Sequence, residues 1–391
     1  MNGSSAKKSK PLRIGILTHN YPAYQKESKD AGKFVYAFSH ELSKKSAVFV
    51  LCPDYNNKTE INDKLVPVSW FDWGSDGTKF GNWSYFSPFT YVNVLKLFRS
   101  GNRVVLEFVK RNKINYLLSF WNFPSGVFAL HANEELNIPY STWALGSDIY
   151  FYSKLPLVRQ IISKVILRAD KVFGNSIDIC KAIKNLTGRS AKVLPTSNSV
   201  SVKDIKIPNL NKKLFNFLYL ARLEKVKGPD LLIEAAKLLT EKKQNFEINI
   251  IGTGSMYEDL KRRISEYKLN NKVKLLGYIE DQSLVNGYLG ESDCLVIPSR
   301  SESFPLVITE ALQVGLPIIG SNVGDVGSFV GKNKIGMVFS SESSELLANC
   351  MEDMIIKGKR LRKTNQAKML KLAKNFELKN IVDKFYNSTN V

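Results

Sequence analysis

Short apolar runs alternate with amphipathic helical segments along most of this chain, and this alternation is the feature that most limits its fold. In the first half the strand-like runs are 13–20, 47–53, 115–121, 140–145, 171–176 and 191–195. In the second half they are 216–221, 246–252, 273–277, 294–299 and 316–322. Strands that are separated by helices pair in parallel through βαβ units. The pattern therefore predicts an α/β chain built on parallel sheets.

A polar stretch at 196–213, rich in Ser, Asn and Lys, interrupts the alternation and has the composition of a linker. A chain of 391 residues is long enough for two ordinary domains. We predict a disordered lead-in at 1–12 and two Rossmann-like, doubly wound domains at 13–195 and 214–374, facing each other across a cleft. Ligands of such sheets bind at the carboxyl ends of the strands, so the cleft is the expected site.

The charge of the chain predicts an anionic partner. The net charge is +20, and residues 1–195 hold 27 Lys+Arg against 14 Asp+Glu. Nucleic acid, an anionic membrane face or a phosphorylated substrate would each suit this balance. Because no helix-turn-helix, zinc or RNP-type signature is present, we expect no nucleic acid partner. A basic nucleic-acid-binding protein remains an alternative.

Cysteine and histidine usage points to a reducing compartment without a metal site. The cysteines form no CxxC pair and lie among apolar neighbours, and the histidines are scattered without metal-ligand spacing. We expect buried thiols, no cofactor and no metal. No apolar run approaches the roughly 18–20 residues that span a bilayer, and no signal peptide is recognisable. The predicted location is the cytoplasm.

The first of three chemically informative segments is LYLARLEKVKGPDLL at 218–232. Arg222 and Lys227 follow a strand that ends at Ala221, and Gly228 and Pro229 open the next helix. Two cations and a helix N-terminus at the end of a strand could hold a diphosphate. An exposed basic loop is the alternative interpretation.

The second segment, IIGTGSMYEDL at 250–260, carries Gly252 and Gly254 between a strand and a helix. Glycines at such a position let the backbone approach a ligand closely, although a plain βα turn explains them nearly as well.

The third segment is DCLVIPSRSESFPLVITEALQVGLPII at 293–319. A strand ends at Pro298, a loop carries Glu302, and Phe304 and Pro305 begin a helix with proline at its first position. Glu310, eight positions after Glu302, would lie roughly 12 Å away along a helix. One carboxylate could then face the sugar and the other the ribose of a nucleotide sugar, with the helix N-terminus under the diphosphate. Two solvated glutamates are the alternative.

Together these segments resemble the retaining glycosyltransferases of GT-B fold, in particular glycosyltransferase family 4, also known as glycosyl transferases group 1. The resemblance covers most of the chain and is strongest from 216 to 325. It implies that Arg222 and Lys227 form the phosphate site, that Glu302 contacts the donor sugar and that Glu310 binds the ribose. It further implies donor contacts from Gly252 and Gly254 and from the residues before and within the first helical turn, namely Ser303, Phe304, Pro305, Leu306 and Val307.

In the first half the resemblance involves two loops. Ala31-Gly32 stands where the family has a Gly-Gly loop near the donor phosphates, which gives Gly32 a donor-binding role. Leu145 occupies the position of a family histidine, and Gly146, Ser147 and Asp148 follow it on the acceptor side. A helix cap is the alternative for Asp148.

The resemblance also concerns two later segments. The C-terminal helix at about 375–391 is expected to pack on the first domain. Gly324-Asp325 stands where a Gly-Gly pair is common.

The resemblance implies a retaining hexosyltransferase that moves a sugar from a nucleotide-sugar donor to a glycan or lipid-linked acceptor, in cell-envelope polysaccharide or glycolipid synthesis. No Asp-x-Asp segment follows a strand, so we predict metal independence. A sugar-nucleotide epimerase of the same architecture is an alternative.

Segments 90–113 and 153–171 interleave apolar and cationic residues. They are either solvated helices with one buried stripe or a peripheral contact with an anionic membrane at its inner face.

Overall fold

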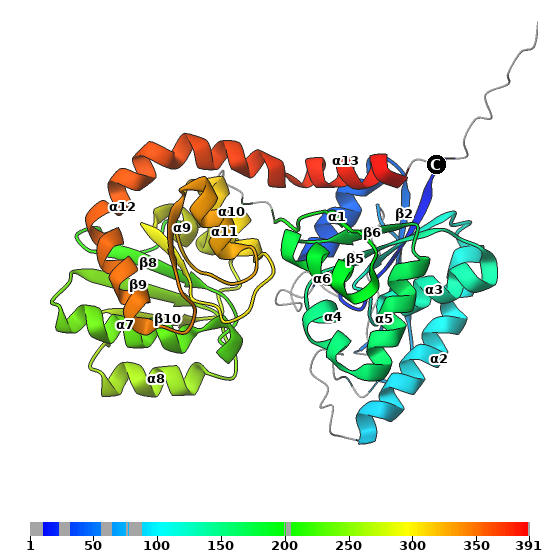
Figure 1. Cartoon of the computed structure of the whole chain (residues 1–391), viewed down its shortest axis with the longest axis horizontal. Helices are drawn as coiled ribbons and strands as arrows, with labels where there is room; N and C mark the ends of the chain where they lie inside the picture. The colour runs from blue at the N-terminus through cyan, green and yellow to red at the C-terminus, as the bar shows by residue number, and fades with distance from the viewer. Residues whose placement is uncertain are drawn as a thin grey trace, which may run out of the picture. The chain divides into compact units, whose positions relative to one another are not determined.

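The computed structural model describes residues 11–22, 32–55, 65–75, 77, 88–198, 200 and 205–389. The chain divides into two compact units, the first made of 1–195 with 378–391 and the second of 196–377 (Figure 1). Some predicted features lie outside the described residues: most of the lead-in (1–10), Ala31 of the loop before the first helix, positions 199 and 201–204 of the linker, and the last two residues of the C-terminal helix.

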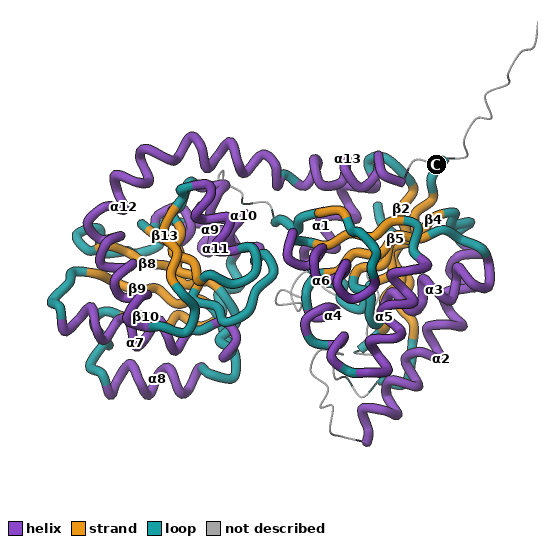
Figure 2. The backbone as a smooth tube through the Cα atoms, viewed as in Figure 1, coloured by secondary structure: helices purple, strands orange, loops and turns teal. Residues whose placement is uncertain are grey.

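The first unit contains a seven-stranded parallel sheet in the order β3-β2-β1-β4-β5-β6-β7. Strands of this sheet are drawn in orange in Figure 2, with helices in purple around them. The strands are β1 Arg13–Leu17, β2 Ala47–Pro53, β3 Val68–Phe71, β4 Tyr116–Phe120, β5 Tyr140–Ala144, β6 Lys171–Gly174 and β7 Lys192–Val193. Chain order along the sheet reverses between β1 and β4, which makes their carboxyl ends the topological switch point of this unit.

Apolar runs form these strands because a parallel sheet is covered on both faces. Every residue of β4 and of β5 is buried. Leu117 and Leu118, which point to opposite faces, belong to two different core clusters. The predicted doubly wound parallel sheet is thereby confirmed for this unit. Strand β3 was not predicted; it is an edge strand in which only Phe71 is fully buried.

Helices of the first unit connect and cover its strands. They are α1 Lys33–Ser43, α2 Pro88–Arg111, α3 Ser125–Leu136, α4 Ser147–Tyr150, η2 Tyr152–Lys154, α5 Pro156–Arg168, α6 Ile177–Thr187 and α13 Leu378–Thr389. Helix α1 starts directly after Gly32, whose φ is 91°. The C-terminal helix α13 packs on α1, where the Phe385 ring lies 5.6 Å from that of Phe38 and 5.9 Å from that of Phe173.

The second unit repeats the design with six parallel strands in the order β10-β9-β8-β11-β12-β13. The strands are β8 Phe215–Leu220, β9 Phe246–Ile251, β10 Val273–Gly277, β11 Cys294–Ile297, β12 Ile318–Ser321 and β13 Gly336–Phe339. The order reverses between β8 and β11, so their carboxyl ends form the switch point of this sheet. The edge strand β13 was not predicted, and only Phe339 within it is buried.

Helices of the second unit are α7 Pro229–Glu241, α8 Tyr257–Glu266, α9 Gln282–Glu291, α10 Leu306–Val314, α11 Val326–Asn333 and α12 Ser344–Ala373, with η3 Lys225–Lys227 and η4 Lys374–Phe376. Helix α12 packs against α7 and α10. The predicted linker is partly integrated into this unit, because Leu210 is buried and the Lys206 N–H donates to the Ser283 carbonyl at 3.3 Å.

None of the described helices combines the length and the hydropathy that crossing a membrane requires. Cys52 and Cys294 are buried, as expected, whereas Cys180 and Cys350 are half-buried.

Candidate active site

The loop after β8 places the two predicted cations next to the switch point of the second sheet. Arg222 is exposed, and its guanidinium makes no hydrogen bond or ion pair with the described residues. Lys227 ends the short helix η3, directly before Gly228 and Pro229, where α7 begins. The buried Tyr219 hydroxyl donates to the Arg222 carbonyl at 3.2 Å and lies 3.5 Å from the Lys227 carbonyl, which ties the two ends of the loop together.

Lys227 and Glu302 meet although 75 positions separate them in the chain. The Lys227 Nζ lies 2.5 Å from Glu302 Oε1, which also accepts a hydrogen bond from Ser299 Oγ at 3.0 Å. The side chains are 21% and 10% exposed. Both contacts fall on Oε1, and Glu302 Oε2 accepts no hydrogen bond from the part of the chain that the structure describes. The pair thus combines a nearly buried carboxylate with one oxygen that a ligand hydroxyl could reach.

A second ion pair, absent from the sequence predictions, holds the same two loops together. Arg300 donates to Asp230 through two parallel bonds of 2.8 and 2.9 Å, and its Nη1 also donates to the Lys225 carbonyl at 2.7 Å. The Arg300 backbone N–H donates to the Val226 carbonyl at 2.8 Å. Asp230 lies in the first turn of α7, where a carboxylate also suits the helix dipole. Arg300 therefore anchors the Glu302 loop to the Lys227 loop.

The predicted helix beginning at Pro305 needs a correction. Pro305 is the extended residue before the helix, with ψ of 139°, and α10 starts at Leu306. Glu302 lies in the loop and only Glu310 lies on the helix, so the predicted spacing of about 12 Å along one helix does not describe them. The first-turn N–H groups of Leu306 and Val307 have no intrahelical acceptor and remain suited to an anion.

Ring packing holds Phe304 in place, and a backbone hydrogen bond holds Ser303. The buried Phe304 ring stacks on Phe376 at 5.4 Å and meets Phe329 edge-on at 5.0 Å. Ser303 is also buried, and its carbonyl accepts a hydrogen bond from the Asp325 N–H at 3.0 Å. Any contact from Phe304 to a ligand must therefore use its backbone.

Glu310 faces the segment that was predicted to be a linker. Asn198 donates its side-chain amide to Glu310 Oε1 at 2.9 Å, and Gln313 Nε2 donates to the Asn198 carbonyl at 2.8 Å. Gln313 Oε1 in turn accepts the Val200 N–H at 2.9 Å. One face of α10 thus fixes the described residues of 197–200, and sequence reasoning missed Asn198 because amides are common in linkers.

Gly252 and Gly254 allow two loops to pack together. A Cβ on Gly252, whose φ is 142°, would lie 1.9 Å from the Ala221 carbonyl oxygen, and one on Gly254 would lie 2.5 Å from the Leu223 carbonyl oxygen. The Met256 N–H donates to the same Leu223 carbonyl at 2.9 Å. Backbone packing therefore accounts for both glycines, and their contact with a donor stays a prediction.

In the first unit, the predicted residues lie at the carboxyl edge of the sheet. Gly32 packs against the chain after β1, since a Cβ there would lie 2.7 Å from the Asn20 carbonyl oxygen. Gly146 adopts φ of 125° directly after β5 and precedes Ser147, the first residue of α4. These positions match the predicted loops, and their roles toward a donor or an acceptor stay predictions.

Asp148 is fully buried and serves as an internal anchor. Its carboxylate accepts the N–H groups of Leu145 and Gly146 at 3.2 and 3.1 Å, and both the backbone and the side-chain amide of Asn122 at 2.9 and 2.8 Å. Burial raises the pKa of the Asp148 carboxyl, while these donors oppose the rise. Asp148 does not cap a helix with its side chain; it joins the loops after β4 and β5.

Two aromatic residues that the predictions did not use as site residues lie at the switch point of this sheet. The ring of His19, after β1, lies 4.3 Å from that of Trp121, after β4. Trp121 has φ of 66°, a strained conformation for a bulky residue, and nothing in its sequence context signals this. Burial lowers the pKa of His19 to about 3, which keeps the ring neutral.

Among the described residues, no group of three or more His, Cys, Asp or Glu side chains could hold a metal ion. The residues that converge in the second unit are instead cations, carboxylates and helix N–H groups. This set suits a ligand that joins a diphosphate to hydroxyl-bearing sugars.

Comparison with known proteins agrees with this chemistry. Residues 201–371 match the family model of glycosyl transferases group 1. An uncharacterized glycosyltransferase of Methanocaldococcus jannaschii is 26% identical over 260 residues, which are 66% of this chain and 69% of the relative. The amylovoran biosynthesis glycosyltransferase AmsK of Erwinia amylovora is 30% identical over 37% of each chain. The chain thus aligns with about two thirds or less of the length of these relatives.

The fold is shared with a solved structure over nearly its whole length. Anabaena HepE in complex with UDP-glucose superposes with a TM-score of 0.69 and 17% identity, covering 96% of this chain and 99% of the other. The protein therefore has the GT-B fold. Its residues 201–371 are similar to glycosyl transferases group 1, as the sequence predicted, and the predicted fold class and the predicted enzyme class, a glycosyltransferase, are confirmed. Membership of glycosyltransferase family 4 stays a prediction.

Proposed function

We propose that this chain is a retaining, metal-independent glycosyltransferase of family 4. It transfers a sugar from a nucleotide-sugar donor to a glycan or lipid-linked acceptor, in the cytoplasm, in the synthesis of cell-envelope polysaccharide or glycolipid. The second unit binds the donor and the first unit binds the acceptor. The name of AmsK, a glycosyltransferase of amylovoran biosynthesis, supports a polysaccharide pathway. The HepE complex supports a nucleotide-sugar donor.

The observation that carries the proposal is the contact between Lys227 and Glu302 at the switch point between β8 and β11. Cleavage of a sugar–diphosphate bond leaves negative charge on the departing phosphate while the sugar becomes cation-like. Arg222, Lys227 and the first-turn N–H groups of α10 supply preorganised positive potential for the diphosphate. The free oxygen of Glu302 accepts a sugar hydroxyl, and Glu310 accepts the ribose hydroxyls.

Retention of the anomeric configuration follows if the leaving phosphate helps to deprotonate the acceptor on the face from which it departs. The acceptor then attacks that same face, and the protein supplies charge and orientation rather than a separate base. Nuclear magnetic resonance of the product tests this step, because an inverted anomeric centre would exclude it.

Thermal-shift measurements with UDP, GDP, ADP and dTDP identify the nucleotide, since the tightest ligand gives the largest stabilisation. Release of that nucleotide from its sugar donors is then assayed for Lys227→Ala and Glu302→Ala. Each variant should lose at least about 100-fold in rate, the scale of removing one charge-stabilising group. Lys261→Ala, an exposed cation on α8, is the control and should retain wild-type turnover. Near-normal rates for either site variant would refute the assignment.

Two further measurements test the reaction class and the absence of a metal. Turnover should continue in excess EDTA, and its complete loss would contradict a metal-independent enzyme. Donor incubated without acceptor should yield no isomeric sugar nucleotide, whereas a new sugar nucleotide would identify an epimerase.

We also propose peripheral contact between this protein and the anionic inner face of the cell membrane. The positive balance of residues 1–195 supports this contact, because cations near an anionic bilayer are attracted to it.

A further inference from the structure

Helix α5 carries apolar side chains on two opposite sides. Ile162, Val165 and Ile166 are fully buried and fix the helix to the core of the first unit. On the other side Leu157 is 76% exposed and Leu167 is 54% exposed. With about 3.6 residues per turn, positions 157, 164 and 167 recur on one face, away from the buried stripe. The exposed leucines therefore contribute nothing to the core of the unit.

The exposed surface of α5 as a whole is strongly and uniformly cationic. Lys154, Arg159, Lys164 and Arg168 lie on or just before α5, and residues 149–169 include no Asp or Glu. Lys164 pairs with Glu134 at 2.8 Å. The other three cations make no ion pair with the portion of the chain that is described. Their positive charge is left for a partner.

Helix α8 of the second unit has an ordinary solvated face and serves as a comparison. On α8, Arg262 pairs with Asp259 at 2.6 Å and with Glu266 at 2.8 Å. Arg263 likewise pairs with Asp259 at 2.9 Å, so both arginines of that helix are balanced by acids about one turn away, and the leucine between them is buried. The unbalanced surface of α5 is thus a local feature and not a simple consequence of the overall composition.

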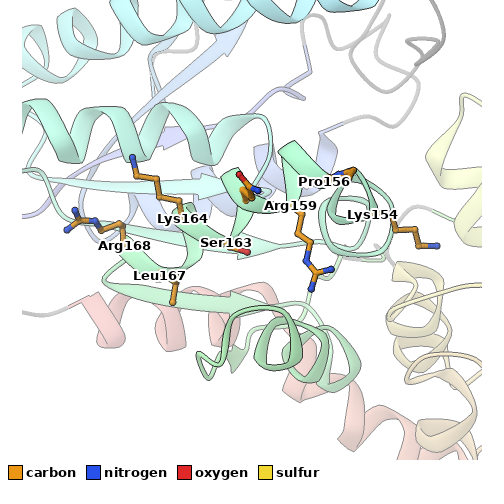
Figure 3. A pocket seen from close by; sticks show the side chains of 8 residues that line it. Lys154, Pro156, Arg159, Ser163, Lys164, Leu167 and Arg168 are labelled. Atoms are coloured by element: carbon orange, nitrogen blue, oxygen red, sulfur yellow. The ribbon is translucent and has the colours of Figure 1, made fainter.

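An open groove of about 680 Å³ runs along the cationic side of α5 (Figure 3). Its lining residues are Lys154, Pro156, Arg159, Gln160, Ser163, Lys164, Leu167 and Arg168. Figure 3 shows Lys154 and Arg159 toward the start of the helix and Lys164 and Arg168 toward its end. The helix of 13 residues is roughly 20 Å long, so the cations are spread over several lipid headgroups instead of converging on one anion.

We propose that this outward face of α5, defined as Lys154, Leu157, Arg159, Lys164, Leu167 and Arg168, docks on a bilayer containing anionic lipid. The helix lies in the plane of the interface, the leucines enter the acyl boundary, and the long cationic side chains reach the phosphates. A phosphate backbone of nucleic acid would satisfy the cations but would give the two leucines no apolar partner. The inference deepens the membrane contact of the proposed function by assigning its surface and lipid class.

Co-sedimentation with vesicles tests the docking, using phosphatidylcholine alone and phosphatidylcholine with phosphatidylglycerol. The wild-type protein should bind the anionic vesicles at least about 10-fold more tightly, and rising salt should weaken binding. Arg159→Gln with Arg168→Gln should lose on the order of 25-fold, roughly 5-fold for each cation. Leu157→Ser with Leu167→Ser should lose at least about 10-fold.

The matched control is Lys261→Gln with Arg262→Gln on α8, which removes the same charge from an exposed helix and should bind vesicles within about twofold of wild type. Failure of wild type to bind anionic vesicles would overturn the inference. An equal loss of vesicle binding in the α8 control would also overturn it, because the effect would then follow from net charge alone. Full vesicle binding by the leucine variant would overturn it as well, because the surface would then be a generic site for polyanions. Nucleotide binding by thermal shift should be unchanged in both α5 variants, so a failure of docking leaves the proposed transfer reaction untouched.

Discussion

Replacement of Arg300 should damage both the stability and the activity of the donor-binding unit. Arg300 is 16% exposed and binds the carboxylate of Asp230, which is 7% exposed, through two parallel hydrogen bonds. Arg300→Ala leaves this carboxylate with one remaining cation, the exposed Lys225. The variant also weakens the connection between the loop that carries Glu302 and the loop that carries Lys227, which then depends on the backbone bond from residue 300 to the Val226 carbonyl and on the Lys227–Glu302 pair.

The expected loss for Arg300→Ala is about 3 kcal/mol, the lower end of the 3–5 kcal/mol that follows from breaking a buried pair, because Arg300 keeps some exposure. That loss should lower the melting temperature of the unit by roughly 6–12 °C. Arg300→Lys keeps the charge but loses the planar fork, so about half of the loss should remain. Lys225→Ala removes a partner that is 65% exposed and should cost no more than about 1 kcal/mol.

Calorimetry of the four proteins measures the stability, and nucleotide release from the donor, assayed well below the melting temperatures, measures the activity. Arg300→Lys should release nucleotide more slowly even when it is fully folded, because Lys227 and Glu302 are no longer held in register. Equal melting temperatures for Arg300→Ala and Lys225→Ala would refute the reasoning. Wild-type turnover by Arg300→Lys would refute its positioning role.

The pH dependence of stability tests the contact between Arg300 and Asp230 through the titration of the Asp230 carboxyl. Burial alone raises the pKa of Asp230, but hydrogen bonds from Arg300 and Lys225 outweigh this effect, and the pKa is lowered. A carboxylate with a lowered pKa in the folded state stabilises the protein above its unfolded pKa of about 3.9 and loses that effect as the pH falls further. The difference in melting temperature between wild type and Asp230→Asn should therefore be full at neutral pH and shrink below about pH 4. A constant difference would contradict this account.

Three other substitutions have expected outcomes. Gly252→Ala should destabilise the second unit and slow nucleotide release, since its Cβ would lie 1.9 Å from the Ala221 carbonyl oxygen; unchanged melting would show that the loops can separate freely. Phe385→Ala, which removes a fully buried ring from between α13 and the rest of the first unit, should cost about 3–5 kcal/mol in a denaturant titration, and a cost below 1 kcal/mol would refute this packing. Asp148→Asn should cost about 1–3 kcal/mol, because an amide cannot accept all four N–H donors; wild-type stability would mean that the carboxylate is not an anchor.

The sequence was informative wherever a strand is buried on both faces. Runs such as those of β4 and β5 are continuously apolar, and their boundaries were predicted to within about two residues. Strands β3 and β13 escaped prediction because they lie at sheet edges and bury a single residue each. Each strand has only four residues, which is too short for a strand period to distinguish it from a loop.

The candidate site was predictable in its members but not in its contacts. Arg222, Lys227 and Glu302 could be placed at the carboxyl ends of strands from the chain alone, yet their proximity depends on β8 pairing with β11, which local patterns do not specify. Arg300 resembled any solvated loop cation. Asp230 had an adequate local explanation at the start of a helix, so nothing in the sequence pointed across 70 residues to its partner.

The glycines at the strand ends have a packing role in the structure, whether or not they also contact a ligand. From the sequence, Gly252 and Gly254 suited either an approaching ligand or a plain βα turn, and their contact with a donor stays a prediction. In the structure carbonyl groups of the β8 loop occupy the space that a Cβ would need. Gly324 behaves in the same way, with the Glu302 carbonyl oxygen 2.0 Å from its hypothetical Cβ. The loops after β8, β9, β11 and β12 are therefore interlocked through their backbones. Electrostatic stabilisation of a leaving phosphate requires groups that need no reorganisation during the reaction, and this interlocking supplies that rigidity while the side chains of Arg222 and Lys227 provide the charge.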